Sequence, residues 1–588
     1  MKKTYSKIIE LLTPAERRSA ILLLCLMIIG MIAEMIGIGL VVPVIALLTQ
    51  QDIISNYPFL HTPLKALGNP SQEVLIISVM LFLVAGYLLK NLFLAFLAWQ
   101  QTRFIFGLKA ELSQRLFALY LKQPYTFHLQ RNSAQLIRNV QTEVNMFTNS
   151  AMTAGTHIIA ESLVLFGVSV LLLVVEPLGI VIVVVMLGVA AFGFHNATKG
   201  FITRWGEARQ YHDGMSILHL HQGLGGAKDV KLLGREFDFL NQFGIHTVQS
   251  AKMYQLQAAL KQIPRLWLEL LGVAGLATLV LSMIMQGREI NAVLPIIGLF
   301  AAAAFRLMPS VNRLIGSVQQ IRYGLPAVDT LYNELSNLAM PNNLTRDIIT
   351  FQKVLQLNDV SYIYPDNEKP ALKEVTLSII KGESIGIIGS SGSGKSTLVD
   401  VILGLLTPSA GHVLVDSQDI QMSIRTWQDQ IGYVPQSIYL TDDTLRRNVA
   451  FGLSNDQIDD AAVKHAIDAA QLMEFVNSLP DGLDTVVGER GVRLSGGQRQ
   501  RIGIARALYH DPALLILDEA TSALDTNTEH GVMQAVSSLR GAKTILIVAH
   551  RLSTVEHCNR LYRLEEGQIV EQGTPAEILN IKNGTSSV

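Results

Sequence analysis

Long apolar stretches separated by charged segments dominate the first 340 residues of the chain. A helix needs about 20 mostly apolar residues to cross the hydrocarbon core of a bilayer. Glu176 and Pro177 predict a tight turn between two of these stretches, and Arg306 and Arg313 interrupt the last one. The pattern predicts six membrane-spanning helices, within residues 20–48, 74–99, 153–175, 178–194, 264–286 and 292–315.

The pattern changes after residue 340. Residues 340–345 have the composition of a linker, and beyond them short apolar runs alternate with helical patterns, as in an α/β domain. We therefore expect two domains, an all-α polytopic membrane domain over residues 1–340 and an α/β domain over residues 341–588.

Composition agrees with this division. Charged residues make up 16% of the chain, against about 25% in an average soluble protein, which suggests membrane segments. The net charge of −1 gives no argument for a nucleic-acid partner. Cys25 and Cys558 lie far apart in the sequence, so no disulfide framework is expected.

The distribution of Lys and Arg predicts the orientation in the membrane. These residues are frequent in segments 100–149 and 195–261, whereas the predicted outer loops contain only Lys65 and Arg288. Because cytoplasmic loops carry the excess of positive charge, we expect both termini and the α/β domain to lie in the cytoplasm. The membrane itself is expected to be the cytoplasmic (inner) membrane. The two long inner segments are amphipathic and are expected to continue the membrane helices into the cytoplasm.

A glycine-rich turn over residues 389–396 matches the pattern GxxxxGK[ST], with an apolar run before it and an apolar helical pattern after it. Backbone N–H groups of such a turn surround phosphate, Lys395 would reach the β- and γ-phosphates, and Ser396 would bind Mg²⁺. The residues predicted to hold the nucleotide here are Gly389, Ser390, Ser391, Gly392, Ser393, Gly394, Lys395, Ser396 and Thr397.

Two carboxylates follow the apolar run over residues 513–517, which predicts a buried strand. Asp518 at the end of this strand can hold the Mg²⁺ shell, and Glu519 can accept a proton from the attacking water or orient it. A second anion-binding turn, Leu494-Ser-Gly-Gly-Gln498, precedes a helical pattern. Two phosphate-binding turns in one chain are unexpected for a simple monomeric nucleotide hydrolase.

These three motifs, in this order and spacing, resemble the ABC ATPases over about residues 351–578, and the preceding six spans resemble the exporter-type membrane domain. The resemblance implies an α/β P-loop ABC ATPase domain that hydrolyses ATP with Mg²⁺ and couples hydrolysis to transport. It also implies a head-to-tail dimer, in which the second turn of one chain completes the nucleotide site of the other. The simplest active unit is then a homodimer, with Ser495, Gly496, Gly497 and Gln498 contacting the partner's nucleotide.

Further residues match the family by position. Tyr364 resembles the aromatic residue that stacks on adenine, and Gln436 resembles the Q-loop glutamine that senses Mg²⁺. Asp525 resembles the D-loop aspartate, and His550 resembles the switch histidine that contacts the γ-phosphate. The resemblance thus implies Glu519, His550 and Lys395 as catalytic residues and Ser396, Gln436 and Asp518 as metal ligands. Segment 485–491 resembles the exporter X-loop, and turns at residues 124–132 and 218–228 are candidate coupling helices.

Charges within the predicted spans are costly and often functional. The cations are Lys90, Arg265, Arg306 and Arg313; they either face a shared cavity, where they would suit a lipid with an anionic head group, or pair with nearby acids, as Arg265 could with Glu269. The segments around Arg265 and Arg306 resemble bacterial flippases of lipid-linked oligosaccharides, which carry a short outer helix that residues 52–67 could supply.

Three functions follow from these observations. The first is ATP-driven flipping of a polyprenyl-pyrophosphate-linked oligosaccharide, a lipid-linked glycan. The second is export of amphipathic drugs, peptides or lipid A-type lipids. The third is a nucleotide-gated channel or regulatory subunit, against which the presence of Glu519 and His550 argues.

Overall fold

The structure, a computed structural model, describes residues 2–40, 72–175, 177–285, 290–338, 348–365, 367–488, 491–521, 526–549 and 551–579. The chain divides into two compact units. The helical unit comprises Met1–Gln123 and His128–Pro341, and the α/β unit comprises Pro124–Phe127 and Asn342–Val588. The predicted domain boundary at residues 340 and 341 lies outside the described residues, as does the predicted outer helix at residues 52–67.

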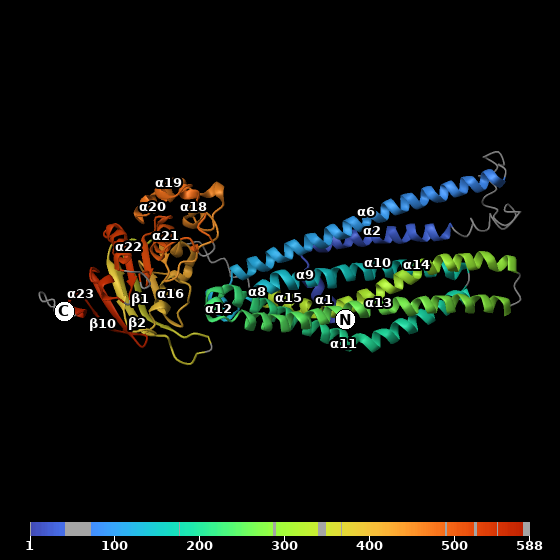
Figure 1. Cartoon of the computed structure of the whole chain (residues 1–588), viewed down its shortest axis with the longest axis horizontal. Helices are drawn as coiled ribbons and strands as arrows, with labels where there is room; N and C mark the ends of the chain where they lie inside the picture. Colours follow the sequence, from blue (N-terminus) through green and yellow to red (C-terminus); the bar gives the residue numbers. More distant parts are fainter. Residues whose placement is uncertain are drawn as a thin grey trace. The chain divides into compact units, whose positions relative to one another are not determined.

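The helical unit consists of long helices joined by short ones (Figure 1). The long helices are α2 (Pro14–Gly39), α6 (Gln72–Leu121), α10 (Thr153–Val175), α11 (Pro177–Gly225), α13 (Glu236–Met285) and α14 (Ile290–Tyr323). The shorter ones are α1 (Lys2–Leu11), α7 (Tyr125–Gln130), α8 (Ser133–Arg138), α9 (Val144–Met146), α12 (Ala227–Leu233) and α15 (Leu325–Asn337), with π-helical turns at Asn139–Glu143 and Phe147–Met152.

Each of the six predicted membrane spans falls on one of the long helices, apart from residues 41–48 and 286, which lie outside the described part of the chain. By length and composition, four described stretches can cross a membrane: Pro14–Gly37, Ile76–Leu121, Ser133–Val174 and Glu236–Met285. The other two predicted spans lie within α11 and α14. Apolar side chains such as Phe82 and Leu89 of α6 are exposed on the unit, as expected of surfaces that face lipid.

Several of the long helices extend well past the thickness of a bilayer. α6 and α13 each have 50 residues, which at 1.5 Å per residue is about 75 Å, more than twice the roughly 30 Å of the hydrocarbon core. The prediction that the charged segments continue the membrane helices is therefore correct. A short helix, α7, also lies within the first predicted turn at residues 124–132.

The second predicted short turn was placed wrongly. Residues 218–225 continue α11 without a break, and the separate short helix is α12, Ala227–Leu233. α11 ends at Gly225, and Gly226 follows it; two successive glycines lower helix propensity. α12 ends at Leu233, and the next residue, Gly234, has a left-handed φ of 63°.

The α/β unit contains two sheets. The antiparallel sheet has the order β2-β1-β4-β5, with β1 (Val354–Tyr362), β2 (Leu372–Ile380), β4 (Ala410–Val415) and β5 (Gln418–Asp419). The mainly parallel sheet has the order β10-β9-β3-β8-β7-β6, with β3 (Ser384–Ile388), β6 (Ile431–Val434), β7 (Leu514–Asp518), β8 (Thr544–Val548), β9 (Arg560–Glu565) and β10 (Gln568–Gly573).

Helices cover both faces of the parallel sheet. These are α16 (Lys395–Ile402), α17 (Ile424–Gln428), α18 (Leu445–Val449), α19 (Asp460–Ala469), α20 (Met473–Ser478), α21 (Gly496–Leu508), α22 (Thr526–Ser538) and α23 (Pro575–Ile578). Side chains alternate across β8, so that Ile545 and Ile547 join the core with α21 and α22. Leu546 and Val548 join the other core, with α16 and the antiparallel sheet. This burial on both faces explains why β3, β7 and β8 are buried along their whole length and consist mostly of apolar residues.

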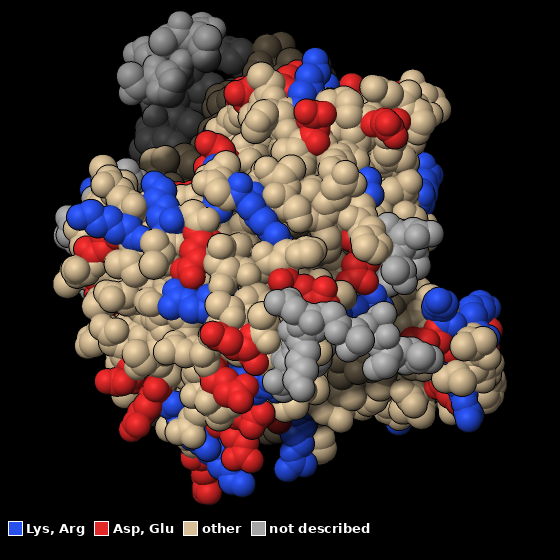
Figure 2. Space-filling view, turned by 90° about the vertical axis from the view of Figure 1, so that its left-hand side faces the viewer, with Lys and Arg blue, Asp and Glu red and all other residues tan. Residues whose placement is uncertain are grey.

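The surface of the α/β unit differs from that of the membrane helices. On the face shown in Figure 2, basic and acidic side chains lie side by side over much of the area. Both cysteines are free, as the sequence predicted: Cys25 is exposed and Cys558 is buried.

Candidate functional site

The carboxyl ends of three parallel strands bring the predicted nucleotide-binding residues together. β3 leads into the glycine-rich turn and β7 ends at Asp518. β8 lies between β3 and β7, and its Val548 pairs with Ile387 of β3 and with Asp518 of β7. The glycine-rich turn and the two carboxylates, more than 120 residues apart in the sequence, therefore meet at the same edge of the sheet, where α/β proteins bind ligands.

The glycine-rich turn requires its glycines. Gly392 and Gly394 have φ values of 80° and 104°, a region that other residues rarely adopt. A Cβ on Gly389 would lie 2.2 Å from the carbonyl oxygen of Leu564. The turn ends at the N-terminus of α16, where Lys395 is the first helical residue, so its N–H groups and the helix dipole both favour an anion.

The Lys395 side chain lies back over this turn. Its Nζ donates hydrogen bonds to the carbonyl oxygens of Gly389, at 3.0 Å, and Ser390, at 2.8 Å. Burial lowers the pKa of the ammonium group, and the charges of Glu519 and Asp518 act in the opposite direction. The cation is thus held at the phosphate-binding turn with acidic groups near it.

Asp518 is a buried carboxylate at the end of β7. Burial raises its pKa, and the neighbouring charge of Glu519 raises it further. The hydroxyl of Tyr433, on β6, donates a long hydrogen bond of 3.4 Å to its Oδ2. Two adjacent carboxylates at the end of a strand are suited to binding a cation.

Glu519 is held in an unusual backbone conformation. Its φ is 49°, in the left-handed region, and its N–H donates to the carbonyl oxygen of Val548 at 3.0 Å. The side-chain amide of Gln436 donates to its Oε2 at 2.8 Å, and Gln500 of α21 in turn donates to the backbone carbonyl of Gln436 at 3.0 Å. Strained residues of this kind occur often at functional sites.

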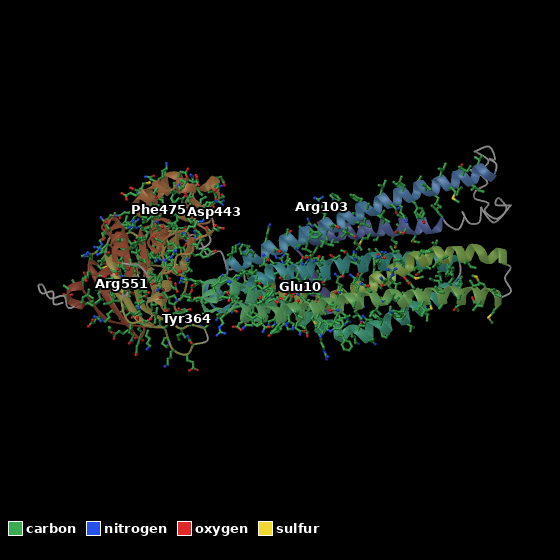
Figure 3. All side chains as sticks on the ribbon, viewed as in Figure 1. Glu10, Arg103, Tyr364, Asp443, Phe475 and Arg551 are labelled. Carbon is green, nitrogen blue, oxygen red and sulfur yellow. The ribbon has the colours of Figure 1, made fainter. Side chains whose placement is uncertain are left out.

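Tyr364 lies beside the start of α16. Its hydroxyl is 3.1 Å from Oγ1 of Thr397, and its ring packs edge-on against Tyr362 with centroids 5.0 Å apart. The two aromatic residues and the phosphate-binding helix therefore form one group. Figure 3 labels Tyr364 and Arg551 on the α/β unit and Glu10 and Arg103 on the helical unit.

The second predicted anion-binding turn is an N-terminal capping box of α21. Oγ of Ser495 accepts from the backbone N–H of Gln498 at 3.2 Å, and Oε1 of Gln498 accepts from the N–H of Ser495 at 2.8 Å. This reciprocal pair satisfies two N–H groups of the helix end and leaves Gly496 and Gly497 as its first two residues.

Some predicted residues lie outside the described part of the chain. These are Asp525 and His550, the side chain of Arg306, and residues 489–490 of the predicted X-loop. Other contributors were missed by sequence reasoning. Tyr433 reaches the site through the packing of β6, and no motif marks it. Gln500 lies on α21, two residues after Gln498 of the predicted second turn, and was given no role there.

The described intramembrane cations are all paired with acids. Lys90 Nζ lies 3.4 Å from Glu34 and 4.3 Å from the ring centre of Tyr87. Arg265 pairs with Glu269 at 3.1 Å, as the alternative reading of the sequence had it, and Arg313 pairs with Glu161 at 2.5 Å. Pairing with an acid lowers the cost of placing each cation within the membrane.

Comparison with known proteins finds similar sequences among transport proteins. A family model described as ABC transporter matches residues 372–522. An "ATP-dependent lipid A-core flippase" of Thiobacillus denitrificans is 32% identical over 488 residues, 82% of this chain and 83% of that protein. Proteins of the same description from Nitrosococcus oceani, 31% identical over 80% of this chain and 78% of that protein, and Cupriavidus metallidurans, 32% identical over 81% and 80%, are also similar.

A solved structure shares the fold. The "Structure of a bacterial Atm1-family ABC exporter with ATP bound" matches with a TM-score of 0.80 and 23% identity, over 96% of this chain and 97% of that chain. The predicted fold class, a helical membrane domain with long helices followed by an α/β ATPase domain, is therefore confirmed.

Proposed function

The protein belongs to the ABC transporters, as an exporter-type half-transporter whose ATPase activity is coupled to transport, and we propose that it flips an amphipathic lipid of the lipid A type across the membrane. The names of its relatives support this substrate class, which was the alternative in the sequence prediction. They give no specific support to the polyprenyl-pyrophosphate-linked oligosaccharide that the sequence placed first.

The observation that carries the proposal is a groove between α13 and α14 in the helical unit, with a volume of about 590 Å³. This is within the roughly 300–1,000 Å³ of small-molecule sites. Its walls are mostly apolar, with Leu268, Val273 and Leu276 on α13 and Ala304, Phe305 and Met308 on α14. In a membrane, a groove with apolar rims is accessible to lipid chains.

The groove has one polar end. Only four residues separate α13 from α14, so the two helices run antiparallel, which puts Arg265 and Asn312 at one end and Leu276 and Ala301 at the other. From Arg265 to Leu276 the helix rises about 17 Å, roughly half of the hydrocarbon core. The groove therefore matches one leaflet, and its polar end belongs to the side from which α13 enters, the cytoplasmic side in the predicted orientation.

The polar end fits a glycosylated, anionic head group. Arg265 is exposed; its Nε donates to Glu269, which also lines the groove, at 3.1 Å. Its terminal N–H groups can bind phosphate as a pair. Oδ1 of Asn312 is buried and has no hydrogen-bond partner among the described residues, so a hydroxyl or amide N–H of a ligand would satisfy it. A lipid with a phosphorylated sugar head and acyl chains carries each of these groups.

The ATPase residues have the following proposed roles. Lys395 and the N–H groups of the turn at 389–397 bind the nucleotide's phosphates, and Tyr364 stacks on its base. Glu519 orients the attacking water or accepts its proton, and Gln436 holds the Glu519 carboxylate through the bond of 2.8 Å. Asp525 and His550 complete the site as the family resemblance implies.

Mg²⁺ fits the donor set. The hydroxyl of Ser396, the amide oxygen of Gln436 and the carboxylate of Asp518 are hard oxygen donors, and the buried Asp518 beside Glu519 has a raised pKa that a cation would relieve. When bound, the ion would neutralise charge on the phosphates.

We infer a homodimer in the cytoplasmic (inner) membrane, with both termini and the ATPase domain in the cytoplasm. The helix N-terminus that begins at Gly496 supports the dimer, because the dipole of α21 favours an anion there. The partner's nucleotide would supply that anion.

Stimulation of ATP hydrolysis by lipids tests the substrate class. Purified protein in nanodiscs is given either a lipid A-type lipid or a polyprenyl-pyrophosphate-linked oligosaccharide, at equal mole fractions. We expect the lipid A-type lipid to raise the rate several-fold and the oligosaccharide lipid to raise it less. The reverse order would restore the oligosaccharide lipid as the substrate. Brisk hydrolysis that neither lipid changes would contradict a lipid flippase.

A further inference from the structure

Glu529, in the first turn of α22, is a buried carboxylate to which the sequence assigns no function. Three side chains use its two oxygens. The hydroxyls of Thr521 and Thr554 both donate to Oε1, at 3.3 Å each, and the guanidinium of Arg551 donates to Oε2. A buried charge is tolerated when it is paired and hydrogen-bonded in this way.

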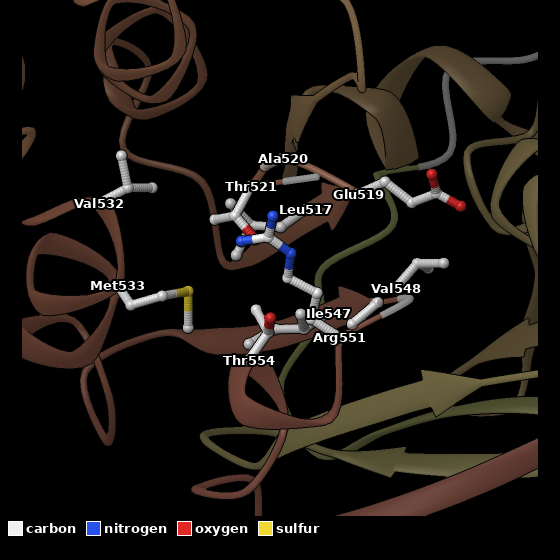
Figure 4. A pocket seen from close by; sticks show the side chains of 11 residues that line it. Leu517, Glu519, Ala520, Thr521, Val532, Met533, Ile547, Val548, Arg551 and Thr554 are labelled. Atoms are coloured by element: carbon white, nitrogen blue, oxygen red, sulfur yellow. The ribbon is translucent and has the colours of Figure 1, made fainter. Parts of the chain in front are cut away.

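The partners come from two separate segments at the edge of the ATPase sheet. Thr521 follows Glu519 by two residues, whereas Arg551 and Thr554 follow strand β8. Figure 4 shows the Arg551 side chain reaching toward Thr521, with Glu519 on the same segment pointing away from it. Glu529 therefore ties the chain after β7 to the chain after β8.

A local role alone does not explain this arrangement. An acidic residue in the first turn of a helix interacts favourably with the helix dipole, and an exposed side chain would suffice for that. Glu529 instead bonds residues 8, 22 and 25 positions away and is only 8% exposed. Its hydrogen bonds connect the segment after β7 with the segment after β8.

The segment that it holds contains strained backbone. Glu519 has a φ of 49°, and such a conformation persists only when the surroundings fix it. On one side, the N–H of Glu519 bonds Val548; on the other, Thr521 bonds Glu529. These two bonds hold the backbone on either side of Glu519, and the amide of Gln436 bonds its carboxylate.

We propose that Glu529 is a positioning residue for ATP hydrolysis, which holds the segment after β7 against the segment after β8 and so keeps the Glu519 carboxylate in place. The inference rests on the proposed role of Glu519 in the ATPase reaction. It concerns the rate of the chemical step, because Glu529 has no group in the nucleotide-binding turn.

The test compares Glu529→Ala with Glu529→Gln in the full-length protein. We expect Glu529→Ala to lower kcat for ATP at least about tenfold, since small displacements of a reacting group have large effects on rate, while KM for ATP changes less than about twofold. Glu529→Gln keeps an acceptor for the two hydroxyls and should lose less. Glu577→Ala, which removes a first-turn acid of α23, is the matched control and should leave kcat within about twofold.

Combination with Glu519→Gln separates positioning from a general structural role. If Glu529 acts through Glu519, adding Glu529→Ala to Glu519→Gln should lower the remaining rate by less than about twofold. A full additional loss, or a rise in KM equal to the fall in kcat, would overturn the inference. Normal hydrolysis by Glu519→Gln alone would instead contradict the proposed ATPase site.

Discussion

The side-chain amide of Gln436 donates a hydrogen bond of 2.8 Å to the carboxylate of Glu519. Strand register explains it: Val434 of β6 pairs with Leu517 of β7, and Gln436 and Glu519 each follow their strand partner by two residues. The bond uses the amide nitrogen of Gln436, so the amide oxygen remains available for a metal ion. One glutamine can thus contact both a bound ion and the carboxylate that is proposed to act on water.

Glu519→Gln tests the reacting group. The variant should bind ATP with nearly unchanged affinity and hydrolyse it at least about a hundredfold more slowly, because a positioned base or water-orienting group is lost. Nucleotide binding and steady-state hydrolysis measure the two properties separately. Hydrolysis at near the original rate would remove Glu519 from the assigned role.

Two variants that we expect to be inactive test the proposed composite site of a homodimer. Lys395→Ala removes the cation of the phosphate-binding turn. Ser495→Asp keeps a good N-cap but places a negative charge where the partner's phosphate would lie. In a head-to-tail heterodimer of these variants, one of the two sites has an intact turn from each chain.

Mixing the two inactive chains before dimer assembly should therefore restore about a quarter of the original rate, from random pairing with one intact site per heterodimer. Ser495→Asn, which caps the helix without charge, should be less impaired than Ser495→Asp. If the mixture stays as inactive as its components, the nucleotide site does not combine turns of two chains.

A large side chain in the membrane groove should block lipid stimulation. Ala304 lines the groove between α13 and α14, and Ala304→Trp should bring the ratio of ATPase rates with and without lipid A-type lipid close to one. Leu270→Trp is the control, because Leu270 is exposed on α13 and does not line the groove. Equal stimulation of both variants would exclude the groove as the lipid site.

Asp400 gives a prediction for stability against pH. Burial, with a further contribution from Asp518, raises the pKa of this α16 carboxyl from 3.8 to about 6. Between these values the folded protein holds a proton that the unfolded chain has lost, so this group lowers stability progressively as the pH rises from about 4 to about 6, and by a constant amount above. Two pKa units correspond to at most about 3 kcal/mol.

Asp400→Asn removes this penalty. The melting temperature of the full-length protein should rise at pH 7.5 and change little at pH 4, the pH values at which about all and about none of the penalty applies. The exposed Asp481 provides a control, since Asp481→Asn should have little effect at either pH. A gain of equal size at both pH values would contradict the assigned pKa.

The sequence predicted most of what depends on local chemistry. The turn at 389–396 and the pair Asp518 and Glu519 are contiguous motifs, and their residue types suit phosphate and metal binding whatever surrounds them. The membrane helices were equally clear, because a bilayer requires long apolar helices. The structure accordingly has these elements at the predicted residues.

The contacts that the sequence did not predict depend on how distant segments pack together. Nothing in the sequence marks Tyr433 as a donor to Asp518 or Glu529 as the partner of Arg551, because both contacts form between segments distant in the chain. The partners of Lys90 and Arg313 were equally hidden, since they lie on other helices. The short helix after α11 was misplaced because the glycine pair that ends α11 was overlooked.

ATP-dependent translocation of a lipid A-type lipid in proteoliposomes tests the central claim most directly. Fluorescent lipid on one leaflet is followed with a membrane-impermeant quencher, with the original protein and with Glu519→Gln. We predict movement to the other leaflet that requires ATP and that Glu519→Gln does not support. Brisk ATP hydrolysis without movement, or equal movement by Glu519→Gln, would contradict an ATP-driven flippase of this lipid class.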